Sequence, residues 1–599
     1  MSSSGNIEIS GLATFAIKVA GTAIPGKLSV LSVYVEKKIN RIPVARIVLL
    51  DGEPNTGKFD ASSSATFLPG AELSIEAGYD SANAVIFKGI ITQQSIRINN
   101  LVGSVLEVEC RDKSIRMTVG RKCLTFSQQK DSDIISSIIG TYSGLTADVS
   151  STLTEWPEQV QYYVTDWDFM LARAEVNGLI VIPMDGTITV APPDANTDAV
   201  YTAKYGDGLY EFNADLNSIM QLGTVKACAW DYKNQAISST QASADKAGPG
   251  NLSTETLSDV IALSTYTLQT TAPLENADLT NWSKSQLIKS EYSKIQGEAK
   301  LDGNNLLAPG QYITIDGIGD RFSGNHLISG VVHNISEGGW FTDVSIGLPA
   351  VWFTEEPDLM SPPASGLLPG ARGLFNGTVK KIFDDPDTQY RILVDIPMFD
   401  TNGAGIWARL SNFYSTSNAG IFFLPEVGDE VVLGFLNEDP RYPIILGSMY
   451  SNSNLKPYTG LDPNEKNQLK AIVSKSGISV EFDDVNKVLT IATPNKNTMV
   501  FSDQDKQVSI KDQNGNSMVM SDNGITINSN TNINITADQN ITIAGKMGVK
   551  VQSSGGDIEV SGLNIKETAQ VQYAAQGNAT AQINGGGELT MKGGMIMIN

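Results

Sequence analysis

The sequence predicts a mainly β protein with a few short helices, whose C-terminal part is an intertwined triple-stranded β-helix, or β-prism. Two patterns lead to this fold class. Many apolar stretches before residue 450 alternate with polar residues, as half-buried strands do. From about residue 470 onward, we expect a repeat of eight residues, in which two β-branched residues flank a polar one and Asn, Asp, Ser or Gly separate the units. The predicted core of this needle is Ile525, Ile527, Ile533, Ile535, Ile541, Ile543, Val549, Val551, Ile558 and Val560.

The short repeat favours three chains wound together. Eight residues provide one strand and one corner, whereas a single-chain β-helix usually needs about twenty residues to close each coil. In a homotrimer each chain would supply one face per step, with Ile533 and Ile535 on the axis and Asn534 facing water. Each strand would pair with a neighbouring chain, which leaves few edges exposed. The alternative is an Asn-rich disordered tail, but disorder does not keep a phased pattern.

Composition and charge limit the classes of function. The 599 residues suffice for about three to five domains. The net charge of −22 argues against nucleic-acid binding. Cys110, Cys123 and Cys228 show no metal-binding spacing, so we expect buried thiols in a chain folded in a reducing cytoplasm. The sequence has neither a basic segment followed by an apolar one at its start nor eighteen consecutive apolar residues, so we expect no signal peptide and no membrane span.

The order of predicted elements divides the chain into domains. Strands fill the region up to about residue 125, and helices are predicted at 131–140, 166–178 and 279–295, with Asp166 as a candidate N-cap of the second. Strands and turns return at 306–350, and a Pro/Gly-rich joint then leads to a compact β segment, a polar linker and the needle. The predicted boundaries are 1–360, 361–373 (linker), 374–452, 453–467 (linker) and 468–599.

Three stretches carry a resemblance to a known family. The first, residues 161–178, contains Asp166-Trp-Asp-Phe-Met-Leu-Ala-Arg173, and the second joins Pro309-Gly-Gln-Tyr-Ile-Thr314 to Gly339-Trp-Phe-Thr342. The third and most specific combines Phe423-Leu-Pro-Glu-Val-Gly-Asp-Glu-Val-Val432 with Asn437-Glu-Asp-Pro-Arg-Tyr-Pro-Ile-Ile-Leu-Gly447. In this order the motifs resemble the VgrG-type spike proteins of contractile injection systems, used in type VI secretion and extracellular injection particles and related to myophage hub–spike proteins. The resemblance covers nearly the whole chain, although Asn437-Glu438-Asp439 stands where the family usually has E-G-D.

The resemblance implies a homotrimer with a hub, a neck and a needle. Residues 1–360 would form a phage-hub-like domain with two β-barrels, near 15–125 and 300–350, so that a trimer offers six barrels to a hexameric tube protein. Residues 374–452 would be the neck, an oligomer-binding (OB) fold. Other implied partners are baseplate components, effector cargo and a PAAR-type tip protein. For the tip protein the apolar end is the candidate dock, unless it is simply the last prism strand: Met595, Ile596, Met597, Ile598 and Asn599.

No motif for catalysis, metal binding or cofactor binding is recognisable. We assign His326 and His333 structural roles, because neither belongs to a metal-ligand pattern. The second linker is too short for an inserted lysozyme domain, and the needle runs to the end of the sequence, so we expect no toxic domain after it. The protein is therefore predicted to be non-enzymatic: sheath contraction would drive it through the target membrane, which is pierced rather than bound, and carry it outside the cell or into a target cell.

Two rival functions remain. A trimeric phage tailspike that binds or cleaves glycans would need paired carboxylates and exposed aromatic rings, but after Phe501 the only aromatic residue is Tyr573. A fibrous adhesin would need an export signal.

Overall fold

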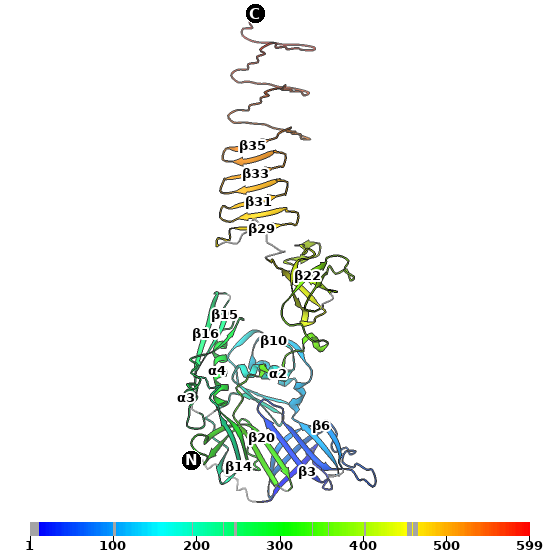
Figure 1. Ribbon diagram of the computed structural model, residues 1–599, viewed down its shortest axis with the longest axis vertical. Coiled ribbons are helices and arrows are strands. Elements are labelled where there is room, and N and C mark those ends of the chain that lie inside the picture. Colours follow the sequence, from blue (N-terminus) through cyan, green and yellow to red (C-terminus); the bar gives the residue numbers. More distant parts are fainter. Residues whose placement is uncertain are drawn as a thin grey trace. The chain divides into compact units, whose positions relative to one another are not determined.

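The computed structural model describes residues 11–99, 103–194, 196–231, 233–244, 248–337, 339–356, 359–399, 403–451, 458 and 465–598 (Figure 1). They belong to two compact units, Met1–Ser448 and Met449–Asn599. Strands far outnumber helices, which confirms the predicted fold class. In the part of the chain so described, no helix is both long and apolar enough to cross a lipid bilayer.

The largest element of the first unit is a sheet of thirteen strands. Their bounds are β1 Ala13–Val19, β2 Thr22–Ala23, β3 Val30–Lys38, β4 Val44–Leu50, β5 Glu72–Tyr79, β6 Ala82–Asn99, β7 Gly103–Arg111, β13 Tyr201–Tyr205, β14 Gly208–Leu216, β18 Ile295–Asp302, β19 Tyr312–Asp316, β20 Gly324–Ser336 and β21 Gly339–Ile346. Their order is β19-β13-β14-β18-β21-β20-β3-β4-β7-β6-β5-β1-β2, and β19 also pairs with β20. The first six strands therefore close into a ring, and the remaining seven continue from β20.

This sheet joins the two regions that the sequence predicts as separate barrels. The joint is the antiparallel pairing of β20 with β3, from Gly330 opposite Lys38 to Ser336 opposite Ser32. Each side keeps its own apolar core, one around Ile47, Phe87 and Leu106 and the other around Ile313, Ile328 and Val344. The two lobes are thus one continuous sheet, because β20 serves both.

The helices of the first unit and several small sheets lie beside this large sheet (Figure 1). Helix α1 spans Asp131–Gly140, as predicted, and α2 spans Asp166–Val176. Helix α4, Asn276–Tyr292, lies three residues before its predicted position, because the chain is drawn into strand β18 from Ile295. The other elements are α3 Thr254–Ser258; β8 Lys122–Lys130 with β10 Glu155–Val164; β11 Ile180–Met184 with β12 Thr187–Ala191 and β9 Thr146–Val149; β16 Ala236–Ser243 with β15 Thr224–Asp231 and β17 Tyr266–Thr270; and the 3-10 turns Lys113–Thr118, Phe353–Glu355, Pro363–Gly366 and Leu436–Glu438.

The prediction that Asp166 is the N-cap of α2 is wrong. Thr165 caps the helix, since its hydroxyl accepts the Asp168 N–H at 3.1 Å. The Asp166 carboxylate is buried instead and accepts hydrogen bonds from Lys122 at 2.6 Å and Tyr142 at 2.7 Å. Tertiary partners have therefore displaced the local capping preference.

Residues 375–448 form a closed barrel of five strands in the order β22-β23-β24-β28-β27, as the predicted neck requires. The strand bounds are β22 Phe375–Lys381, β23 Ile392–Asp395, β24 Ile406–Leu410, β27 Glu430–Phe435 and β28 Pro443–Ser448, with the small hairpin β25 Ser415–Thr416 and β26 Ala419–Gly420. Val379, Val394, Ala408, Leu433 and Ile445 fill its interior.

The second unit begins with an antiparallel meander of seven strands, drawn in Figure 1 as successive rungs. The strands are β29 Leu469–Val473, β30 Ser479–Asp483, β31 Val488–Ala492, β32 Thr498–Ser502, β33 Gln507–Lys511, β34 Ser517–Ser521 and β35 Gly524–Asn528. Beyond β35 the described chain continues as extended segments separated by bends.

Candidate functional site

The meander repeats on nineteen residues, not on eight. Strands β29, β31 and β33 begin at Leu469, Val488 and Gln507. Each repeat contains two strands of five residues, joined by turns of alternately five and four residues, except for the two-residue turn before β35. The expectation of an eight-residue repeat from about residue 470 is therefore wrong for this stretch. Each strand here pairs with the next strand of its own chain, so a repeat must supply two strands and two turns.

Strand pairing brings apolar side chains onto one face of the meander, which we call the needle face. Residues opposite each other in an antiparallel pair point to the same side of a sheet, as do alternate residues along one strand. The opposite face is mixed, with polar and charged residues at most positions and small apolar residues such as Ala471, Val500 and Val519 at others. The needle face has two columns: Ile472, Val480, Ile491, Met499, Ile510, Met518 and Ile527; and Lys470, Phe482, Leu489, Phe501, Val508, Met520 and Ile525.

The needle face stays partly exposed in the single chain. Exposure is 56% for Ile472, 39% for Phe501 and 55% for Ile527. A row of this length, with one lysine among its fourteen side chains, is far more apolar than the surface of an ordinary monomer. The face therefore has the character of a surface that another element covers.

Asparagines connect successive turns along the meander. The Asn497 side-chain oxygen accepts the Gln513 N–H at 3.0 Å, one turn further on. Asn516, nineteen residues after Asn497, accepts hydrogen bonds from the Ser529 hydroxyl at 2.8 Å and the Asn530 N–H at 3.2 Å. These bonds hold the turns in register beside the strands.

The acidic pair Asp483 and Asp484 stabilises a turn of this meander. Hydrogen bonds from the backbone N–H and side chain of Asn486 hold the pKa of Asp483 below its usual value. Asp484 pairs with Lys470. Both carboxylates thus have structural partners, in keeping with a solvated corner.

Ile525 and Ile527 of the predicted core lie in β35 on the needle face, opposite Met520 and Met518. The other predicted core residues lie beyond β35, where the structure has bends at 530–531, 538–539, 546–547 and 554–556. Each predicted pair occupies the second and fourth positions of the segment between two bends, so the bends keep the period of the sequence pattern. Their exposure runs from 51% at Ile541 to 73% at Ile543, and so the single chain does not bring these pairs together.

The same register continues past the residues that sequence reasoning identified. Bends follow at 563, 570–571, 578–579, 586–587 and 594. Continuing from Ile558 in steps of seven or eight residues would have found the further core-type positions, whose residue types are more varied. They are Ile565 and Glu567, Tyr573 and Ala575, Ala581 and Ile583, Leu589 and Met591, and Ile596 and Ile598.

The predicted docking residues at the end of the chain fall into two classes. Ile596 and Ile598 occupy positions of the core type, whereas Met595 and Met597 occupy positions that elsewhere hold polar residues such as Asn534. Met595 is 79% and Met597 80% exposed. Asn599 lies outside the described residues.

The two histidines are buried in strand β20. Burial lowers the pKa of His333 to about 3, and its Nδ1 lies 3.1 Å from the Thr342 hydroxyl. His326 Nε2 bonds to the carbonyl of Phe322 at 2.7 Å. Over the described ranges, no three His, Cys, Asp or Glu side chains gather in a way that could hold a metal ion.

Two protein families match the chain. Residues 9–337 match the family described as Alg8 N-terminal domain, and residues 375–450 match the family described as type VI secretion system/phage-baseplate injector OB domain. The first match spans more than half of the sequence, and the second coincides with the five-stranded barrel.

Individual proteins are similar over shorter stretches. The chain is 32% identical over 79 residues to the type VI secretion system spike protein VgrG1a of Pseudomonas aeruginosa, which is 13% of this chain and 12% of that protein. It is 43% identical over 53 residues to the actin cross-linking toxin VgrG1 of Vibrio cholerae, 9% of this chain and 5% of that one. The matches thus span a small part of both relatives. The structure of the E. coli c3393 protein, a type VI secretion component similar to the T4 tail proteins gp27 and gp5, has a TM-score of 0.38 at 13% identity and covers 72% of this chain and 99% of its own.

Proposed function

This chain belongs to the Alg8 N-terminal domain family and is a VgrG-type spike protein, and from that premise we propose that it acts as a homotrimeric, non-enzymatic spike at the tip of a contractile injection machine. The single observation that carries the proposal is the long apolar surface of the second unit. It runs from the needle face into the pairs at the second and fourth positions of the extended segments.

Three copies of the needle face, turned toward a common axis, would remove this surface from water. Complete burial of a Val, Ile, Leu, Phe or Met side chain contributes about 1.5–3 kcal/mol. The thirteen apolar side chains of each needle face, and the further pairs beyond β35, are only partly covered in the single chain, so burial of their remaining exposed surface favours association. Beyond β35 the extended segments would then pair with neighbouring chains, which satisfies their backbone groups.

The hub and neck would connect this needle to the machine. With two lobes in each chain, a trimer presents six, which matches a hexameric tube protein in number. Baseplate components and effector cargo are further proposed partners. A density map of the tube complex with six hub contacts supports this arrangement, and one with three contacts contradicts it.

The contracting sheath would supply the mechanical work, and the spike would need only to be stiff. The spike would then leave the producing cell and pierce the target membrane. A stiff β-structure needs no catalytic cycle for this task. One relative is described as an actin cross-linking toxin, but the similarity is confined to 53 residues and does not bring that activity to this chain.

The trimer is tested by the mass of the full chain in solution. Light scattering coupled to size exclusion should give three times the chain mass of 64.1 kDa at micromolar concentration. A monomer under these conditions contradicts the proposal, since a single chain leaves the needle face uncovered.

We also propose that Met595 and Met597 form the outer part of a dock for a PAAR-type tip protein, while Ile596 and Ile598 complete the trimer core. Replacing both methionines by glutamine should lower co-purification of the tip protein at least tenfold and leave the trimer mass unchanged, because only the outward positions change. Lys550→Gln is the matched control, since Lys550 is an outward residue far from the chain end.

The complementary test of this dock is a deletion. Removing residues 589–599 should abolish capture of the tip protein. Undiminished capture by the shortened chain contradicts the dock.

A further inference from the structure

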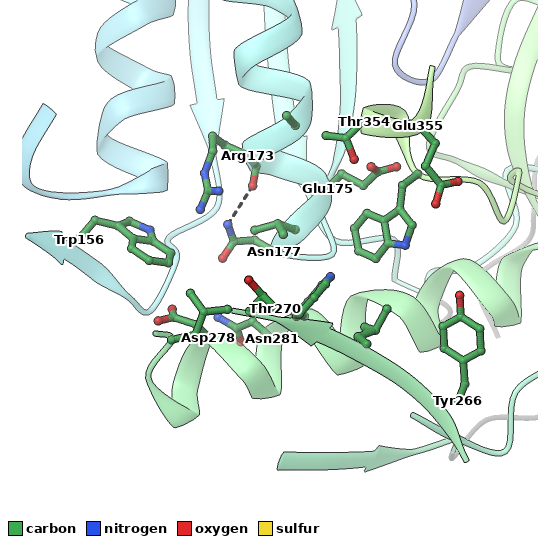
Figure 2. A pocket seen from close by; sticks show the side chains of 16 residues that line it. Trp156, Arg173, Glu175, Asn177, Tyr266, Thr270, Asp278, Asn281, Thr354 and Glu355 are labelled. Carbon is green, nitrogen blue, oxygen red and sulfur yellow. Dashed lines mark hydrogen bonds between the residues drawn. The ribbon is translucent and has the colours of Figure 1, made fainter. Parts of the chain in front are cut away.

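A pocket of about 430 Å³ lies in the first unit, and we call it the hub pocket (Figure 2). Helix α2 bounds it on one side and β17 with α4 on the other, while Trp156 stands at one end and Tyr266 at the other. Its volume is within the range of ligand sites, about 300–1,000 Å³.

Two of the charges on its walls are already neutralised. The Arg173 guanidinium donates to both carboxylate oxygens of Asp131, at 2.8 and 2.9 Å. Glu175 pairs with Lys289 and also accepts the Phe353 N–H at 2.7 Å. Neither pair therefore needs a ligand.

Asp278 is a different case. It is only 8% exposed, it lines the hub pocket, and it has no ion-pair partner among the described residues because the nearby Arg173 is engaged by Asp131. Burial raises the pKa of its carboxyl group. The Thr154 hydroxyl and the Glu275 backbone N–H at the start of α4 favour its charged form, but among the described residues no cation is free to neutralise it.

Aromatic side chains are spread along the walls of the hub pocket. Trp156, Trp282, Trp352 and Tyr266 line the hub pocket. Such faces attract ammonium and guanidinium groups, and the protein's own Arg173 lies 5.2 Å from the ring centroid of Trp156. Of the charged residues that line the pocket, Asp278 and the exposed Glu355 have no ion-pair partner in the described part of the chain, so the pocket is complementary to a cation on an apolar stem.

A free strand edge borders the same space. The small sheet has the order β16-β15-β17, so β17 pairs with β15 alone among the described strands. Helix α4 packs on β15 and β16, whereas Tyr266, Leu268 and Thr270 of β17 line the pocket. An edge strand of this kind accepts an added strand, and pockets beside it read alternate side chains.

We propose that the hub pocket receives a lysine or arginine side chain from an extended segment of a partner protein, with Asp278 as the counter-ion and the segment paired along the free edge of β17. This site lies in the first unit and does not depend on the needle or on trimer formation. It is a docking site for protein, and a free organic cation is the competing occupant that the experiment must separate.

The experiment uses the full-length protein and blocked synthetic pentapeptides, acetyl-Thr-Val-Lys-Val-Thr-amide and the same peptide with norleucine for lysine. Calorimetric titration should show at least tenfold tighter binding of the lysine peptide. Asp278→Asn should remove this preference and leave the weak binding of the norleucine peptide unchanged. Asp207→Asn, a matched change at an exposed turn of the same unit, should leave both affinities as they are.

A second variant covers the case in which Asp278→Asn impairs folding. Asn281→Lys places a resident cation on the wall of the pocket and should abolish binding of the lysine peptide. Equal binding of the two peptides, no binding at millimolar concentration, or an unchanged preference in both variants overturns the proposal. Equally tight binding of N-acetyl-lysine methylamide would overturn the peptide dock in favour of a small-cation site.

Discussion

Replacing Phe501 by aspartate is expected to convert the proposed trimer into monomers. Phe501 stands in the middle of the second column of the needle face, opposite Leu489 and Val508. In the trimer three aspartates would approach one another inside an apolar core. Each buried, unpaired carboxylate costs several kcal/mol, and the three like charges repel one another.

The matched control lies one residue away. Val500 points to the opposite face of the same strand, opposite Thr490 and Ser509. Val500→Asp introduces the same charge on the opposite, more polar face, where Glu481 already lies in the same column, so the trimer should persist. Light scattering at several concentrations decides between the two, and a Phe501→Asp trimer as stable as the native one would refute the assignment of the needle face.

The second large effect is expected at Asp131 in the hub. This buried carboxylate accepts hydrogen bonds from Arg173, from the Asn177 amide at 2.9 Å and from the Trp156 indole at 3.1 Å. Asp131→Ala leaves the guanidinium, whose side chain is 18% exposed, without its partner. Removing one member of a buried pair costs about 3–5 kcal/mol, so the midpoint of hub unfolding in urea should fall clearly.

Asp133 provides the comparison for this variant. It lies in the same first turn of α1 but is exposed, so Asp133→Ala loses only a favourable charge at a helix N-terminus, worth about 0.3–1 kcal/mol. Equal urea midpoints for the two variants would show that the hydrogen bonds of Asp131 do not stabilise the hub.

The needle illustrates which repeats can be found in a sequence. Pairs such as Ile533 and Ile535 are both β-branched and recur at a constant spacing, so the eight-residue period is visible without a structure. The nineteen-residue period was missed because its equivalent positions differ in type, as with Phe482, Phe501 and Met520 on the needle face. The recurring asparagines Asn497 and Asn516 were its best available signal.

Other features depend on contacts between distant parts of the chain. The sequence pattern predicts Asp166 as the N-cap of α2 because it takes account only of residues close in sequence. In the structure this side chain instead accepts hydrogen bonds from the distant residues Lys122 and Tyr142. The hub pocket depends even more strongly on such contacts. Trp156, Tyr266 and Asp278 come from three separate elements, and no sequence motif connects them.

The pairing of β20 with β3 has a consequence for how the hub meets its partner. Seven consecutive residue pairs connect the lobes, so neither lobe can rotate about the joint without breaking a ladder of backbone hydrogen bonds. The hub therefore has no hinge at its own midpoint. In the proposed trimer, three such rigid bodies would face a six-fold tube, and any misfit between the two symmetries would fall on the contacting loops or on the partner, not on the joint between the lobes.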